Sequence, residues 1–211
     1  MAETGRSPAP SKREMADFAT ARHASPEPPA AEAEERALVE RARRRDVGAF
    51  RALVVRHQDR VYAVALRITR SPGDAADVAQ ESFLKAWQAL PGFRGEAGFG
   101  TWLHQVVARR ALDRAEALSG RRSREVALEA AAEESAELPP QRDRPLAARL
   151  ERLLSRLSPA QRAVVSLFYL EEHSVEGVAA ALEMPGNTVK THLYRARAAL
   201  REAWLREEPE P

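Results

Sequence analysis

The chain has 211 residues, of which 44% are hydrophobic and 30% charged, and its 33 basic and 31 acidic side chains leave a formal net charge of +2. It contains no cysteine, which excludes disulfide bonds and thiolate metal sites. No apolar run approaches the roughly 18 residues that a membrane span needs, and the N-terminus lacks the apolar segment of a signal peptide. We therefore expect a cytoplasmic protein of one or two small domains, without membrane insertion.

The N-terminal segment predicts a disordered tail over residues 1–33. It is rich in Ala, Pro, Glu and Arg, with the run ASPEPPAAEAEE near its end. A segment of this composition cannot bury enough apolar surface to offset the entropy that it would lose on ordering. We therefore expect no stable fold in this part of the chain.

The next segment, 34–118, has the spacing of a first helical bundle. A helix is predicted over 47–69 because its apolar residues recur three and four positions apart. The tripeptide SPG stops this pattern, and Asp74 is the candidate N-cap of a second helix. A Pro-Gly pair ends that helix, and the short loop FRGEAGFG leads into a third.

Helical periodicity fades after residue 118, and the proline-containing segment 119–145 is interpreted as a linker. Periodicity resumes in 146–206, where Ser158 begins a capping box with Pro at the first helical position. Ser174 is the candidate cap of a further helix. The fold is thus predicted to be all-α, with two small helical bundles joined by a flexible linker.

The final helix is predicted to bind DNA. A short helix, a Pro-Gly-Asn turn and a second helix with a basic face form the pattern of a helix-turn-helix, whose second helix enters the major groove. No acidic residue occurs from Met184 to Arg201. Carboxylates on this face would be repelled by phosphates, so their absence favours a polyanionic partner.

These segments resemble sigma factors of the extracytoplasmic-function (ECF) class of the sigma-70 family. The stretch LSPAQRAVVSLFYLEEHSVEGVAAALEMPGNTVKTHLYRARAAL resembles their promoter-binding C-terminal domain. DAADVAQESFLKAW resembles their polymerase-binding helix, and FRGEAGFGTWLHQVVARRALD resembles the segment that melts the downstream promoter element. The resemblance extends over roughly residues 46–205, with both sets of motifs in the family's order.

The resemblance implies a bacterial transcription factor without enzymatic activity, cofactor or small-molecule substrate. Its partners would be core RNA polymerase, promoter DNA and, as a further candidate, an anti-sigma factor. Residues 34–118 would act as sigma region 2, which binds polymerase and recognises the −10 element. Residues 146–206 would act as sigma region 4, whose helix-turn-helix recognises the −35 element.

The resemblance also assigns site residues, which fall into three sets. The polymerase-binding residues would be Asp77, Gln80, Glu81 and Lys85. The residues for the −10 element and for melting would be Phe93, Arg94, Gly95, Glu96, Trp102, Arg109 and Arg110. The residues for the −35 element would be Lys190, Thr191, Tyr194 and Arg195 at base edges, with Arg197 and Arg201 at phosphates.

Within the second set, the loop 93–98 lies where the family forms a pocket for a base flipped out of the duplex. Trp102 is either a stacking platform for a base or a residue of the core. Arg109 departs from the family, which commonly has Asn at this position. Asn both donates and accepts hydrogen bonds whereas Arg only donates, which bears on how the downstream element is read.

Two other classes of protein remain alternatives. An autonomous helix-turn-helix regulator could use the first bundle as a sensor or dimeriser, but it would not need both DVAQESFLKAW and FRGEAGFGTWL. A nuclease or other DNA-modifying enzyme would need clustered carboxylates or histidines. The five histidines are scattered along the chain, so we predict neither catalytic residues nor a metal site.

Overall fold

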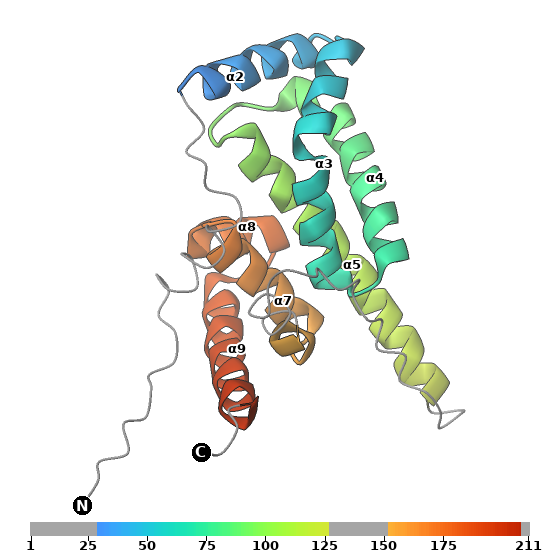
Figure 1. Cartoon of the computed structure of the whole chain (residues 1–211), viewed down its shortest axis with the longest axis vertical. Coiled ribbons are helices and arrows are strands. Elements are labelled where there is room, and N and C mark those ends of the chain that lie inside the picture. The colour runs from blue at the N-terminus through green and yellow to red at the C-terminus, as the bar shows by residue number, and fades with distance from the viewer. Residues whose placement is uncertain (1–28, 127–151, 208–211) are drawn as a thin grey trace, which may run out of the picture.

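The computed structural model describes residues 29–126 and 152–207, and its regular elements in these ranges are all helical (Figure 1). They are α2 (Pro29–Arg43), α3 (Val47–Thr69), α4 (Pro72–Ala89), the 3-10 turn η1 (Leu90–Gly92), α5 (Phe99–Val126), α7 (Pro159–Val165), the π-helical turn η2 (Ser166–Leu170), α8 (Val175–Leu182) and α9 (Gly186–Glu207). The predicted all-α class is confirmed. In the described ranges, no helix is long and apolar enough to cross a membrane.

Side-chain caps set the helix boundaries of the first bundle. Helix α3 has the predicted bounds, and Asp46 caps it by accepting the N–H of Ala49 at 3.0 Å. The prediction that Asp74 caps the next helix is wrong. The cap is Ser71, whose hydroxyl accepts the N–H of Asp74 at 3.3 Å. The tripeptide SPG therefore starts α4 as well as ending α3, because Pro suits the first turn of a helix.

Two expected boundaries are corrected by the structure. Helix α2 begins at Pro29, inside the tail that was expected to extend to residue 33. Its Val39 and Ala42 are buried, and such tertiary packing stabilises a helix that composition alone disfavours. At the other end of the bundle, α5 continues to Val126, into the expected linker 119–145. Residues 1–28 and 127–151 lie outside the described part of the chain.

The predicted caps of the second bundle are confirmed. Ser158 and Gln161 form a reciprocal capping box at the start of α7. Ser174 caps α8 by accepting the N–H of Gly177 at 3.0 Å. Between these helices, η2 ends with the N–H of Glu171 donating to the carbonyl of Ser166 at 3.0 Å. This single π turn sets the position of Glu171 next to the first bundle.

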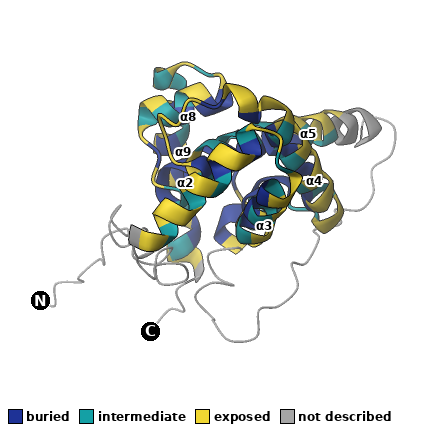
Figure 2. Ribbon diagram, turned by 90° about the horizontal axis from the view of Figure 1, so that it is seen from above, coloured by how far each residue is buried: buried dark blue, intermediate teal, exposed yellow. Residues whose placement is uncertain are grey.

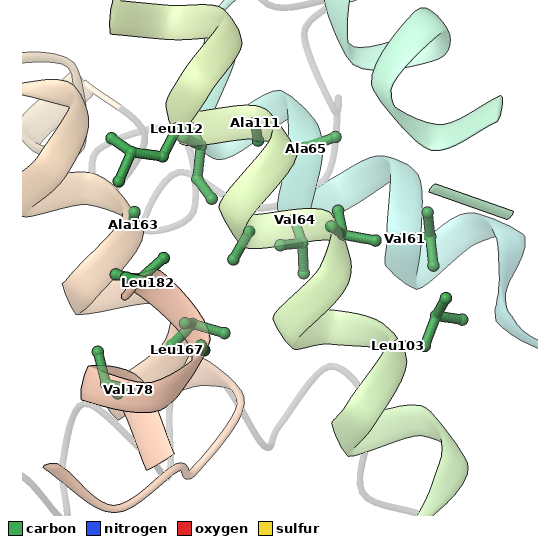
Figure 3. Packing of buried hydrophobic residues seen from close by; sticks show 14 of the residues in the cluster. Val61, Val64, Ala65, Leu103, Ala111, Leu112, Ala163, Leu167, Val178 and Leu182 are labelled. Carbon is green, nitrogen blue, oxygen red and sulfur yellow. The ribbon is translucent and has the colours of Figure 1, made fainter. Parts of the chain in front are cut away.

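The two bundles share one hydrophobic core. Helix α5 lies between them, with Val64 of α3 on one side and Leu167 and Leu182 of the second bundle on the other (Figure 3). Figure 2 shows that buried residues gather where the helices face one another and that exposed residues cover their outer sides. The sequence predicted two bundles joined by a tether, and the structure adds a direct contact between them.

Arg162 of α7 strengthens this contact. Its side chain is buried, and its guanidinium donates two hydrogen bonds to the carbonyl of Ile68 in α3, at 2.8 and 3.0 Å. A third bond, of 2.6 Å, goes to the carbonyl of Leu157. Burial, with a smaller contribution from the charge of Arg70, lowers the pKa of Arg162 to about 10. The group therefore remains protonated at neutral pH.

Candidate nucleic-acid interface

Helix α9 presents the predicted −35 residues to solvent. Val189, Leu193 and Ala196 form its buried stripe, as their spacing predicted. The six predicted contact residues are all exposed: Lys190, Thr191, Tyr194, Arg195, Arg197 and Arg201. In Figure 1 the helix lies on the side of the molecule away from α4. Its outer face is thus free to approach a groove of DNA.

The start of α9 is also suited to an anion. Helix α8 ends at Leu182, and its C-cap Glu183 adopts the left-handed conformation with φ of 52°. The chain then turns, and the N–H of Thr188 donates to the carbonyl of Pro185 at 2.8 Å. The first turn of α9 contains no acidic residue. No carboxylate of the first turn therefore competes for its free N–H groups or for the positive end of the helix dipole. This arrangement favours binding of a phosphate at the N-terminus of α9.

The predicted −10 loop, residues 93–98, borders a cavity of about 880 Å³. Arg94, Gly95 and Glu96 are exposed, and Gly95 has φ of 73°, a conformation that other residues rarely adopt. Helices α2, α3 and α5, together with Glu171 of the second bundle, supply the remaining walls of the cavity. Because glycine has no side chain at this turn, a ligand can approach the backbone closely.

Trp102 belongs to an aromatic cluster beside this loop. Its ring centroid is 5.0 Å from that of Phe93 and 5.8 Å from that of Phe99. Phe93 and Phe99 are buried, whereas Trp102 is half-buried. The structure therefore gives Trp102 a packing role in the first bundle and leaves part of its surface accessible.

The predicted polymerase-binding residues share one exposed side of α4. Asp77, Gln80, Glu81 and Lys85 are all exposed. Asp77 is paired with Arg114 of α5 at 3.2 Å, and Glu81 is paired with Arg110. Sequence reasoning missed Leu84, which is 58% exposed between these polar residues. Its only sequence signal was an apolar residue lying off the buried stripe of the helix.

Arg109 contacts the second bundle. It donates a 2.6 Å hydrogen bond to the carbonyl of Leu182, at the end of α8. Its guanidinium also lies 3.3 Å from the carboxylates of Glu183 and of Asp113. Arg109 and Arg110, both predicted to bind DNA, are thus engaged in intramolecular ion pairs in this arrangement. No sequence pattern indicated the contact with α8, because its acceptor is a backbone carbonyl from a distant segment.

Glu171 was missed altogether by sequence reasoning. Its side chain is only 3% exposed, although it comes from the second bundle and its ion-pair partners come from the first. The partners are Nδ1 of His104 at 2.8 Å, Nε of Arg60 at 3.1 Å and Nη1 of Arg67 at 3.9 Å. Burial raises the pKa of Glu171, but the hydrogen bond and charge of His104 and the charges of the two arginines outweigh it and lower the pKa.

The lowered pKa of Glu171 predicts an acid-sensitive contact between the bundles. Glu171 faces Arg60 and Arg67 on α3 and His104 on α5, and it also interacts electrostatically with His173. A carboxyl whose pKa is lower in the folded state stabilises the fold above its ordinary pKa of about 4.3. This contribution is lost as the pH falls through the lower, folded value.

We therefore expect the thermal midpoint of unfolding to fall on acidification, and to fall less in Glu171→Gln than in the unmodified chain. Melting curves from neutral pH down to about pH 3 measure this difference, over a range that contains the ordinary glutamate pKa. Parallel decreases in the two proteins would show that Glu171 contributes nothing to the acid sensitivity.

The chain matches two family models, Sigma-70 region 2 over residues 53–121 and Sigma-70, region 4 over residues 147–200. It is 37% identical over 177 residues to the ECF RNA polymerase sigma-E factor of Salmonella typhimurium, covering 79% of this chain and 92% of that protein. It is 32% identical over 182 residues to the RNA polymerase sigma-H factor of Pseudomonas aeruginosa, covering 81% and 93%.

Solved structures show the same fold. The sigma factor RpoE from Bartonella quintana, determined in complex with the anti-sigma factor NepR, superimposes with a TM-score of 0.59 at 23% identity. The match covers 77% of this chain and 100% of the Bartonella quintana chain. CnrH, in complex with the cytosolic domain of CnrY, gives a TM-score of 0.57 at 25% identity over 83% of this chain and 99% of the other.

Proposed function

This chain belongs to the ECF class of sigma-70 family RNA polymerase sigma factors, and we propose that it directs core polymerase to promoters through separate −35 and −10 contacts. Helix α9 would read the −35 element, and the loop 93–98 with its cavity would receive a base of the −10 element. The observation that best supports this proposal is the outer face of α9 from Gly186 to Arg201, which is exposed, basic and without carboxylates.

The proposal gives each DNA-facing part a separate physical role. Four residues of the first half of α9 would reach base edges, which discriminate sequence: Lys190, Thr191, Tyr194 and Arg195. Arg197 and Arg201 would contact phosphates, which fix position. In the first bundle, the cavity beside Gly95 would hold an unstacked base, whose extraction costs a few kcal/mol and therefore needs a shaped site.

Core polymerase, promoter DNA and an anti-sigma factor are the proposed partners. The first two follow from membership of the family, and the third is suggested by the complex in which the Bartonella quintana relative was solved. We infer that the chain acts in the cytoplasm, together with polymerase, and that it has no catalytic activity of its own. An autonomous helix-turn-helix regulator, the alternative considered from sequence, would not account for the match to region 2.

Reconstituted transcription tests the proposal. The purified full chain is mixed with core polymerase and with templates that contain a library of −35 and −10 sequences. We expect transcripts that start at a subset of these templates and that require the chain. Binding of the free chain to a promoter duplex without any polymerase-dependent transcript would instead favour the autonomous regulator.

Reversing charge on α4 should separate polymerase binding from folding. In Asp77→Lys/Glu81→Lys, we expect at least about 30-fold weaker binding to core polymerase, because charged groups at an interface contribute about 2 kcal/mol or more when their partners are left unpaired. Co-elution with polymerase and far-ultraviolet circular dichroism measure the two effects. Glu116→Lys/Glu202→Lys is the matched control, since both residues are exposed and lie off this face. Equal binding by the two variants would remove α4 from the polymerase interface.

A further inference from the structure

A group of nitrogen-rich side chains on the first bundle faces the second bundle. We call it the basic strip, and it consists of Arg60 and Arg67 of α3 with His104 and Arg109 of α5. Two carboxylates of the second bundle, Glu171 and Glu183, lie against it. The strip therefore faces negative charge that another part of the same chain supplies.

The geometry around Glu171 is that of an anion site. One carboxylate accepts from His104 and Arg60 and lies near Arg67, and all three groups come from the other bundle. A carboxylate that is 3% exposed is stable only when its partners offset the loss of its hydration. The surrounding groups thus form a preorganised receptor for an oxyanion. Phosphate oxygens are ligands of the same kind, and arginine binds them in the same geometry.

Arg109 extends the strip along α5. Its nitrogen atoms contact the carbonyl of Leu182 and the carboxylate of Glu183, both at the end of α8. Glu183 is 71% exposed at its side chain, in contrast to Glu171. Arg109 thus meets a peripheral acid at one end of the strip, whereas Arg60 and Arg67 meet a buried acid.

The strip continues into the cavity of the −10 loop. Arg60, His104 and Glu171 line that cavity together with residues 93–101. A nucleic acid strand that places a base at the loop would therefore bring its neighbouring phosphates to this wall. The side chains that it would meet there are those that now hold Glu171.

We propose that the basic strip binds the phosphate backbone of single-stranded promoter DNA, and that Glu171 and Glu183 occupy it as phosphate mimics until the two bundles separate. The proposal rests on the proposed function, because it takes the loop 93–98 as the place where the duplex is opened. It adds Arg60, Arg67 and His104 to the DNA-binding residues and gives the second bundle a role in covering them.

Binding of a fluorescein-labelled oligo(dT) strand to the full chain, followed by anisotropy, tests this proposal. In Glu171→Gln, we expect binding about tenfold tighter, and a dependence of log K on log salt that is steeper by about 0.7 for each freed cation. The matched control is Glu202→Gln, which removes the same charge from the exposed face of α9. Its affinity for oligo(dT) is expected to stay close to that of the unmodified chain.

Adding Arg60→Ala and Arg67→Ala to Glu171→Gln should abolish the gain. Equal gains in Glu171→Gln and Glu202→Gln would overturn the proposal, because they would reduce the effect to net charge. A larger gain for a duplex of the same length than for the single strand would overturn the assignment of the ligand. Absence of any gain in a folded Glu171→Gln protein would also overturn it.

A second variant covers the case in which Glu171→Gln does not fold. Glu183 is largely exposed, so Glu183→Gln should preserve the cooperative melting of the chain while it frees Arg109 of one carboxylate. We expect tighter oligo(dT) binding and a salt dependence steeper by about 0.7. Unchanged binding in this variant, with Glu171→Gln unfolded, would count against the proposal.

The transcription assay distinguishes this proposal from the one on which it rests. Promoter-dependent transcription by the unmodified chain, with no gain of oligo(dT) binding in either variant, would leave the sigma function in place and reject the strip. A gain of oligo(dT) binding without transcription would support the strip as a nucleic-acid surface and reject the promoter function.

Discussion

Replacing Lys190 or Arg195 with alanine will change which −35 sequences the protein prefers, whereas replacing Arg201 will weaken binding to all of them alike. Lys190 and Arg195 lie in the early part of α9 and are exposed. A good contact to a base is worth about 1–3 kcal/mol, or a change of about 5- to 150-fold in discrimination. Arg201 lies late on the helix, where we place it at a phosphate, and loss of a phosphate contact lowers affinity without changing sequence preference.

The measurement is binding of the full chain, together with core polymerase, to a series of promoters with single-base changes in the −35 element at several salt concentrations. Arg201→Ala should lower the salt slope by about one unit. Arg206→Ala is the control, because Arg206 is exposed at the end of α9 and pairs with Glu202. If Lys190→Ala and Arg195→Ala weaken every promoter equally, α9 contributes only charge, and its proposed register in the groove is wrong.

Arg162→Met should destabilise the whole molecule by about 3–5 kcal/mol. The substitution keeps much of the side-chain volume but removes three hydrogen bonds from a charged donor. The three bonds satisfy two carbonyls, because two of them share the carbonyl of Ile68, and a carbonyl bonded to a charged donor contributes about 1.5–3 kcal/mol. The carbonyl of Ile68 is at the end of α3, so part of the loss falls on the contact between the bundles.

Denaturant unfolding of the full chain measures this loss. Arg206→Met is the matched control, since it removes an arginine from an exposed ion pair with Glu202, a contact worth about 0.5 kcal/mol or less. Arg162→Lys should fall between the two, because lysine keeps the charge but lacks the planar fork of donors. Similar free energies of unfolding for Arg162→Met and Arg206→Met would show that the bonds to Ile68 do not stabilise the structure.

Local chemistry was the part of the fold that the sequence predicted well. Helix α3 has the expected bounds, Ser158 and Ser174 form the expected caps, and the buried stripe of α9 is in the expected register. Each of these features depends on residues a few positions apart, so periodicity and capping motifs are sufficient to detect it. The prediction for Asp74 failed because Ser71 and Asp74, three positions apart, are both residues that commonly cap helices, and it is Ser71 that has the extended backbone of an N-cap.

Long-range contacts were the part that the sequence could not predict. Arg162 bonds to a carbonyl 94 residues away, and Arg109 to one 73 residues away. Every residue has a backbone carbonyl, so the sequence does not indicate which carbonyl accepts the hydrogen bond. Glu171 follows an apolar run and precedes a second glutamate, and nothing in that pattern distinguishes the buried acid from the exposed one. The basic strip became visible only when α3, α5 and η2 were brought together.

The shared core of the two bundles limits how far apart on DNA the two bundles can bind at the same time. The −35 and −10 elements lie about 25 base pairs apart, which is about 85 Å of duplex at about 3.4 Å per base pair. A compact chain of roughly 150 residues has a radius of gyration of only about 15 Å. If α9 and the loop 93–98 contact these two elements as proposed, a body of this size cannot reach both while its bundles stay together, and promoter recognition would require an extended form. If the extended form is about 1% of the free chain, a partner that binds only this form has an apparent affinity about a hundredfold below its intrinsic affinity. A partner that binds the closed form keeps its full affinity.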